Sequence, residues 1–256
     1  APLNYNVIDH LTIATTGNTQ DFGDLTRSRR EMGGSSSTTR GIFMGGRSPV
    51  PSGVNNDEDI IDYITIASTG NAVDFGNLAA ARTAGASCSN AIRSLYSGGN
   101  SSNSIEFVTI ATLGDAVDFG DMNNALNRLG SCASSTRGII AGGSPTNNTI
   151  EYVTIATTGD AQDFGDLTRA REGPGGLSNS IRGVFGAGDT PSMLNIIDYI
   201  TIASLGDAID FGDLSYTNSY IGATASQTRG LFAGGYSPFT NNIEYLSIDT
   251  TGDTTD

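Results

Sequence analysis

The chain of 256 residues repeats one short, strand-like segment six times, and this repeat constrains the fold more than any other feature. The segment begins as Ile8–Ile13 and returns for the last time as Ile243–Ile248. An aromatic residue or histidine marks each copy, at His10, Tyr63, Phe107, Tyr152, Tyr199 and Tyr245. The steps between these positions are 53, 44, 45, 47 and 46 residues. A period of this length favours a unit of about four short strands joined by tight turns.

Two further signatures follow the strand-like segment in five of the copies. The first is Gly-Asp/Asn-x-x-Asp-Phe-Gly, and its phenylalanines are Phe22, Phe75, Phe119, Phe164 and Phe211. The second starts with an arginine, continues as an apolar strand and ends in a glycine pair, loosened in one copy to Gly186-Ala187-Gly188. Its arginines are Arg40, Arg93, Arg137, Arg182 and Arg229. The intervening Ser, Asn, Pro and Gly residues are typical of turns.

Both faces of the repeated strands are rich in apolar residues. In Ile150–Ile155, one face carries Ile150 and Tyr152, and the other carries Val153 and Ile155. A sheet that is apolar on both sides has to be covered on both sides, which stacked neighbouring copies can do. The sequence therefore predicts an all-β fold, with one β-propeller domain of four-stranded blades over residues 1–256.

The number of blades depends on how the two ends of the chain overlap. The copies cover roughly residues 6–53, 54–99, 100–143, 144–188 and 189–235, and residues 236–256 duplicate the N-terminal strand. Five blades are favoured, with the ring closed by pairing of the C-terminal strands with the Phe22 strand. Six or seven blades are the alternative if the chain is cut from a longer array.

The order of these signatures resembles a kelch repeat, in which a glycine pair ends the second strand, a Tyr lies on the third and a Trp begins the fourth. Here Phe takes the Trp position in every copy, and His10 and Phe107 replace Tyr. The arginine that follows the aromatic residue in that family has three counterparts, Arg29, Arg82 and Arg171. The third copy has Arg128 two residues late and the fifth has Asn218. The wording of the repeat also resembles kelch-like repeats of phage virion structural proteins, which implies a tail, fibre or capsid-surface component.

Composition excludes several classes of function. The 27 acidic residues exceed the 13 basic ones, all of them Arg, and a net charge of −14 repels phosphate backbones, so we expect no nucleic-acid partner. We also expect no membrane insertion, because no apolar run reaches about 18 residues. One His and no Trp argue against a His-ligated copper or zinc centre and against a sialidase. No cofactor and no catalytic residue are predicted.

Acidic triplets and two cysteines are further candidate sites. Carboxylates recur at a spacing of three residues, as in Asp115, Asp118 and Asp121, but without the alternating ligand loop of a calcium site. Structural turns are therefore favoured, with a structural cation such as calcium as the alternative. The acidic run 55–59 is expected to be a solvated loop. Cys88 and Cys132 occupy equivalent places on adjacent blades, too far apart for a disulfide, and are expected to be free thiols.

The repeated aromatic and basic residues are expected to be architectural. The five phenylalanines should fill the space between blades, and each repeated arginine should pair with a blade Asp or a backbone carbonyl. An arginine ring that holds an anion in a channel is the alternative. The turns that follow the glycine pairs differ in length and residue type, so they are better candidates for binding. Their candidate binding residues are Arg47, Met193, Tyr236 and Phe239.

These observations favour a non-enzymatic structural or recognition module. The resemblance implies a phage virion protein at the virion surface or in the extracellular space, which presents loops to a host glycan, a host protein or another virion subunit. A glycoside hydrolase-type propeller enzyme is one alternative, with Glu31 and Glu172 as the unrepeated carboxylates. An intracellular kelch scaffold for a protein partner is the other.

Overall fold

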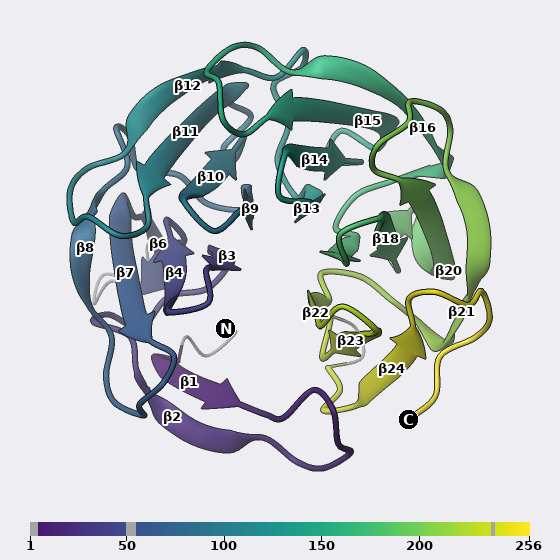
Figure 1. The fold of residues 1–256 in the computed structure, drawn as a ribbon, viewed down its shortest axis with the longest axis horizontal. Helices are drawn as coiled ribbons and strands as arrows, with labels where there is room; N and C mark the ends of the chain where they lie inside the picture. Colours follow the sequence, from purple (N-terminus) through teal and green to yellow (C-terminus); the bar gives the residue numbers. More distant parts are fainter. Residues whose placement is uncertain (1–4, 50–54, 237–238) are drawn as a thin grey trace.

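The protein is an all-β, five-bladed β-propeller. The computed structural model describes residues 5–49, 55–236 and 239–256, and within these ranges the chain forms strands and turns and no helix. The described residues accordingly include no helix that could cross a membrane. Small antiparallel sheets stand side by side in a ring, with the strands of each sheet following one another outward from the centre (Figure 1).

The five blades follow one another in sequence. The first blade consists of β3 (Gly33–Ser36), β4 (Arg40–Met44), β7 (Ile60–Thr65) and β8 (Val73–Asn77). The second consists of β9 (Ala86–Ser89), β10 (Arg93–Ser97), β11 (Ser104–Thr109) and β12 (Val117–Asp121). The third consists of β13 (Gly130–Ala133), β14 (Arg137–Ala141), β15 (Asn147–Thr154) and β16 (Gln162–Arg171). The fourth consists of β17 (Gly175–Ser178), β18 (Arg182–Gly186), β20 (Ser192–Thr201) and β21 (Ile209–Asn218), with β19 (Asp189–Thr190) also paired to β20. The fifth consists of β22 (Gly222–Ala225), β23 (Arg229–Ala233) and β24 (Ile243–Ser247).

Each blade joins two successive copies of the sequence repeat. Strand β4, which starts at the repeated arginine, pairs with β7 of the next copy, so that Ile42 lies opposite Tyr63. The glycine pair directly follows this second strand, which places most of the repeat boundaries in the turn between the second and third strands of a blade. The boundary expected at residues 53 and 54 lies outside the described residues. In the same turn of the first blade, β5 (Arg47–Pro49) and β6 (Asn55–Asp57) form a separate two-stranded ribbon.

The ring closes differently from the strand exchange that the sequence predicts. The Phe22 strand, β2 (Gln20–Asp24), pairs with β1 (Val7–His10) of its own copy. The C-terminal strand β24 pairs with β23, and Thr255 bridges Tyr245 on its outer side. A hairpin joined by a short loop loses less chain entropy on closure than a pairing between opposite ends of the chain. The sheet β1–β2, which we call the half-blade, fills the sector between the fifth and first blades with outer strands (Figure 1).

The apolar core lies between neighbouring sheets. One cluster joins Ile42 and Met44 of the first blade to Val108 and Ile110 of the second. Each repeated phenylalanine lies in one of five such clusters, is 2–7% exposed, and meets the aromatic residue or histidine of the adjacent strand edge-on at 5.7–6.1 Å. Such pairs add to the free energy gained from burial alone. The phenylalanines thus hold neighbouring blades together.

The repeated Asp or Asn of each turn also links two blades. The amide N–H of Asp121 donates to Asp160 Oδ1 of the next copy at 3.0 Å, and the Gly159 N–H donates to the Phe119 carbonyl at 2.7 Å. The same 3.0 Å bond recurs in the other pairs, Asp24–Asn71, Asn77–Asp115, Asp166–Asp207 and Asp213–Asp253.

In the part of the chain that the structure describes, no group of three or more His, Cys, Asp or Glu residues is arranged to hold a metal ion.

The repeated arginines connect the second strand of one sheet to the third strand of the next. Each Nη1 donates to an isoleucine carbonyl at 2.7–3.2 Å, in the pairs Arg40–Ile110, Arg93–Ile155, Arg137–Ile202, Arg182–Ile248 and Arg229–Ile13. Each guanidinium also lies over the aromatic ring of its own blade, 3.7–4.8 Å from the centroid. These contacts support the architectural interpretation of the arginines over an anion-binding ring.

Both cysteines are free and buried, and we expect them to be inert in the native protein. Burial raises the pKa of Cys88 to about 12 and also raises the pKa of Cys132. Because the thiolate is the reactive form, neither should react with a disulfide reagent at neutral pH until the chain unfolds. Thiol titration with and without denaturant measures this directly. Modification of either cysteine in the native protein, at the rate of an exposed thiol, would contradict the burial described.

Candidate functional site

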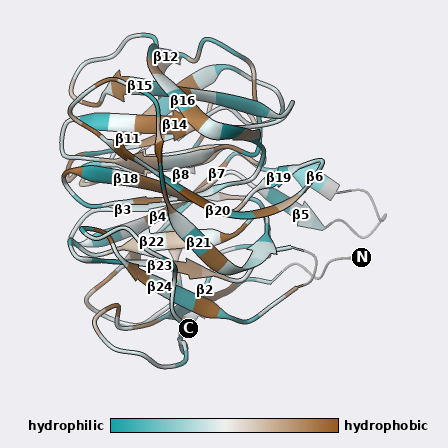
Figure 2. Cartoon of the chain, turned by 90° about the vertical axis from the view of Figure 1, so that its right-hand side faces the viewer, coloured by the Kyte–Doolittle hydropathy of each residue, from teal (hydrophilic) through white to brown (hydrophobic). Residues whose placement is uncertain are grey.

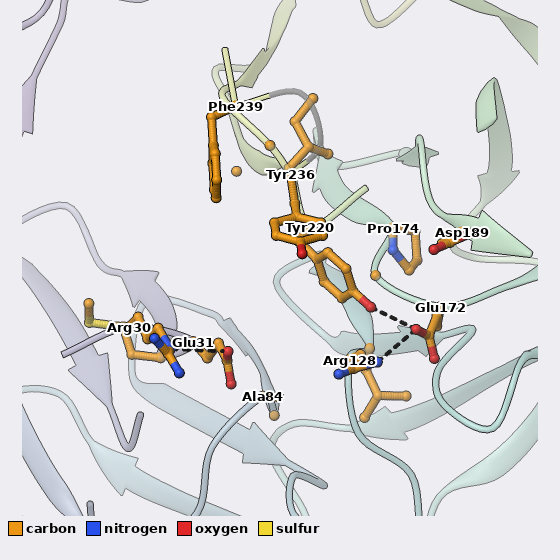
Figure 3. Close-up of a pocket in the computed structure, with 17 residues that line it drawn as sticks. Arg30, Glu31, Ala84, Arg128, Glu172, Pro174, Asp189, Tyr220, Tyr236 and Phe239 are labelled. Atoms are coloured by element: carbon orange, nitrogen blue, oxygen red, sulfur yellow. Dashed lines mark hydrogen bonds and ion pairs between the residues drawn. The ribbon is translucent and has the colours of Figure 1, made fainter. Parts of the chain in front are cut away.

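A cavity of about 820 Å³ opens at one end of the ring and is lined by residues of all five sequence copies. The lining includes Glu31, Arg128, Glu172, Tyr220 and Tyr236 (Figure 3). We call it the mouth cavity. Pockets of this size, with a few polar groups pointing into them, are the usual sites of ligand binding.

The rim of the mouth cavity is built from equivalent residues that all have left-handed backbone conformations. They are Glu31, Ala84, Arg128, Gly173 and Tyr220, with φ between 54° and 65°. Each amide N–H, from Ala84 onward, donates to the carbonyl of its counterpart in the preceding copy, at 2.6–2.9 Å. This conformation is uncommon outside glycine and clusters at functional sites. The backbone of the rim is therefore uniform, whereas its side chains differ at every position.

The variable turns lie beside this rim. Backbone bridges join the residue before four of the five rim positions to the residue after the glycine pair, in the pairs Arg30–Arg47, Asn127–Ser144, Glu172–Asp189 and Ser219–Tyr236. The turns therefore gather at the end of the ring where the mouth cavity opens. In the side view, β5, β6 and β19 lie on the same side of the molecule (Figure 2).

A charged cluster occupies one side of the mouth cavity (Figure 3). Arg128 Nη1 lies 2.8 Å from Glu172 Oε1, and the Tyr220 hydroxyl donates to the same oxygen at 2.6 Å. Burial alone would raise the pKa of Glu172, but hydrogen bonds from Ser144, Tyr220 and Arg128 outweigh it and lower that pKa. Burial and the bond to Glu172 raise the pKa of Tyr220. At neutral pH the cluster thus presents an ionised carboxylate, a guanidinium and a neutral phenol.

Glu31 lies on another side of the mouth cavity, with Ala84 between it and the Glu172 cluster (Figure 3). Its carboxylate lies 3.4 Å from Arg30 Nε and accepts a hydrogen bond from Thr83 Oγ1 at 3.2 Å. The two unrepeated glutamates named from the sequence therefore reach the same cavity from different copies. Each of them is already held by a neighbouring donor.

Aromatic side chains form the third part of the site. Tyr220 meets Tyr236 edge-on at 6.0 Å, and Tyr236 meets Phe239 at 5.4 Å. Tyr236 is 50% exposed and Phe239 is 74% exposed, so both present apolar surface to the solvent at the cavity. Exposed aromatic rings of this kind are common at recognition surfaces.

The structure brings two of the four candidate binding residues to the mouth cavity. Tyr236 and Phe239 line it. Arg47 lies next to the rim through its backbone bridge to Arg30, and its side chain binds Asp57 Oδ1 at 2.7 Å. Met193 lies in β20 and is paired with Asp189, which lines the cavity; Met193 itself is half-buried and is not a lining residue.

Two predictions from the sequence are wrong. Arg128 is not a displaced version of the arginine that follows the aromatic strand, because buried Leu126 takes that place and Arg128 is a rim residue. The acidic run 55–59 is not a solvated loop: Glu58 is buried and accepts bonds from Ser48 and Arg27. Asn218, which replaces the arginine in the fifth copy, donates from Nδ2 to the Gly234 carbonyl at 2.9 Å, as Arg82 does to the Gly98 carbonyl.

The rim could not be recognised from residue types, because its side chains do not repeat. A signal was available in the spacing, since each rim residue lies nine positions after the phenylalanine of its copy. Comparison with models of known protein families and with curated proteins finds no match to this chain. The function of the site therefore has to be inferred from its geometry.

Proposed function

We propose that the protein is a non-enzymatic recognition module that binds a ligand at the mouth cavity. The observation that carries this proposal is the rim, where one backbone conformation presents a different side chain in each copy. A repeated scaffold whose side chains vary around one cavity fits a role in which that cavity determines specificity. The chemistry of the cavity favours a glycan, because exposed aromatic rings can lie against sugar rings while Glu172, Glu31 and Arg128 hydrogen-bond hydroxyl groups.

The place of such a module on a phage particle is part of the same proposal. Its support is the resemblance of the repeat wording to kelch-like repeats of virion structural proteins, together with a strongly acidic chain rich in hydrogen-bonding residues. The mouth cavity would then bind a glycan of the host surface. A host protein or another virion subunit is the alternative partner. No cofactor enters the proposal.

The proposal predicts saturable binding of the purified chain to surface polysaccharide of its host. The measurement is equilibrium binding to a panel of immobilised polysaccharides and to whole cells, with free sugars as competitors. We expect binding that saturates and that one class of free sugar displaces. Absence of binding across a broad panel would overturn the glycan version.

A hydrolytic function is the second candidate, because both unrepeated glutamates reach the mouth cavity. Glycoside hydrolysis needs one carboxylic acid that stays protonated to act as general acid, which requires a raised pKa. The pKa of Glu172 is lowered instead, and its carboxylate is bound by Arg128 and Tyr220. Glu172 is therefore unsuited to act as the general acid, and the carboxylate of Glu31 is already bound by Arg30 and Thr83, so we expect no sugar release from a bound polysaccharide. Release that Glu172→Gln abolishes would favour the enzyme.

A further inference from the structure

The half-blade has an open inner edge. Strand β1 pairs with β2 on its outer side, and no described strand pairs with its inner side. The five blades all have inner strands between the corresponding position and the centre of the ring (Figure 1). An open strand edge presents unpaired N–H and C=O groups and can accept another strand.

Apolar surface is exposed around this edge where the same repeat position is buried elsewhere. Ile66 is 42% exposed, whereas four of its five counterparts are at most 2% exposed, at Ile110, Ile155, Ile202 and Ile248, and the fifth, Ile13, is half-buried. Each of those four isoleucines packs against the complete sheet that precedes its own blade. The sheet that precedes the blade of Ile66 is the half-blade, which has only two strands. On the other flank, Thr224 of β22 is exposed, although three of its four counterparts, Cys88, Cys132 and Leu177, are buried.

Polar groups around the half-blade also differ from their counterparts. The five repeated arginines donate to five isoleucine carbonyls, and the Ile66 carbonyl is not one of them. Asp9 occupies the position of Asp62, Glu106 and Asp198, which bind buried arginines at Arg29, Arg82 and Arg171. Asp9 is exposed and accepts from Thr19 at 3.4 Å. His10 Nδ1 is buried and has no hydrogen-bond partner among the described residues.

We propose that the half-blade is a docking site for the inner hairpin of one further copy of this repeat. The second strand of that hairpin pairs with the inner edge of β1. Its arginine lies over His10, donates to the Ile66 carbonyl and so repeats the contacts of Arg40 with Tyr63 and Ile110. The arginine that precedes the hairpin in the repeat binds Asp9. The site is complementary to this hairpin in charge and in shape. The carboxylate of Asp9 and the carbonyl of Ile66 match its two arginines, and the exposed side chain of Ile66 matches the apolar face of its strands.

The test uses the thiol of Ile66→Cys as a reporter, because the two native cysteines are buried. A copy of residues 164–188 is appended directly after Asp256, which occupies the repeat position of Asp163. The appended copy contains the counterparts of Arg171 and Arg182. We expect the reporter thiol to react about tenfold more slowly with maleimide than in the unextended variant. We also expect a higher Tm.

A matched control keeps the length of the extension and replaces the counterparts of Arg171 and Arg182 with glutamate, leaving the counterpart of Arg169 unchanged. This control should leave the thiol as reactive as in the unextended chain. If the extended chain aggregates, a synthetic peptide of the same 25-residue sequence (residues 164–188), titrated onto the Ile66→Cys chain, must give the protection instead. Equal reactivity with both extension and peptide would overturn the proposal. Protection of the unextended chain that rises with its own concentration would also overturn it, because the occupant would then be a second copy of the chain.

Discussion

Replacing Arg171 with methionine is expected to lower the free energy of unfolding by about 3–5 kcal/mol. Arg171 and Asp198 are both fully buried, and their Nη2 and Oδ2 atoms lie 2.7 Å apart. The same guanidinium donates to the carbonyls of Ile196 and Phe185. The substitution would leave the carboxylate of Asp198 buried without its counter-charge and two carbonyls without their donor, and each of these is costly in an apolar interior.

Denaturant unfolding of the two proteins measures this effect. Arg169→Met is the matched control, since Arg169 is exposed two residues away on the same strand and should change stability little. The double change Arg171→Met with Asp198→Leu should recover part of the loss, because it removes the unpaired charge. A loss below about 1 kcal/mol for Arg171→Met would show that this pair is not a main support of the third and fourth blades.

Gly120→Ala is expected to lower the free energy of unfolding by about 2–4 kcal/mol. A Cβ at Gly120 would overlap the carbonyl group of Gly159 in the next blade and lie 2.9 Å from the backbone nitrogen of Asp160, and φ is 145°. Backbone atoms of two blades meet at this point, so neither can move away without opening the contact between them. The same close approach recurs at Gly23, Gly76, Gly165 and Gly212.

Gly159→Ala separates the two causes of that loss. Gly159 has a similar φ of 152°, but no atom lies within 4 Å of its added Cβ. It should therefore show the cost of the backbone conformation alone, which is smaller than that of Gly120→Ala. Equal losses in thermal or denaturant unfolding would contradict the role assigned to close contact between blades.

The fold was predictable because the residues that hold blades together recur in every copy. Phe119 and its counterparts fill equivalent spaces between neighbouring sheets, and only a side chain of the same shape fits each space. Phe therefore recurs at each of these positions, and the period of the repeat can be read from the sequence. The closure was not predictable in the same way. Residues 236–256 look like the N-terminal copy, but β2 already pairs with β1 of its own copy, so the C-terminal strands do not pair with the Phe22 strand.

The candidate site was predictable only in part. Tyr236 and Phe239 could be named because they lie in a turn that differs between copies, and Glu31 and Glu172 because they are unrepeated. The cluster of Arg128, Glu172 and Tyr220 could not, since its members come from three copies and meet only when the ring is formed. Along the sequence, Arg128 looks like a shifted repeat residue.

Recognition at the mouth cavity can be tested by one binding measurement. The affinity for the polysaccharide that binds the chain in the panel described above is compared between two double variants. Tyr236→Ala with Phe239→Ala removes the exposed rings of the cavity, and Ile92→Ala with Ile181→Ala removes two exposed apolar residues in the turns at the opposite end of the second strands. If the ligand binds at the mouth cavity, the first variant loses about a hundredfold in affinity and the second binds as the unchanged chain does. Equal affinities of the two variants, or a loss confined to the second, would show that the ligand binds elsewhere.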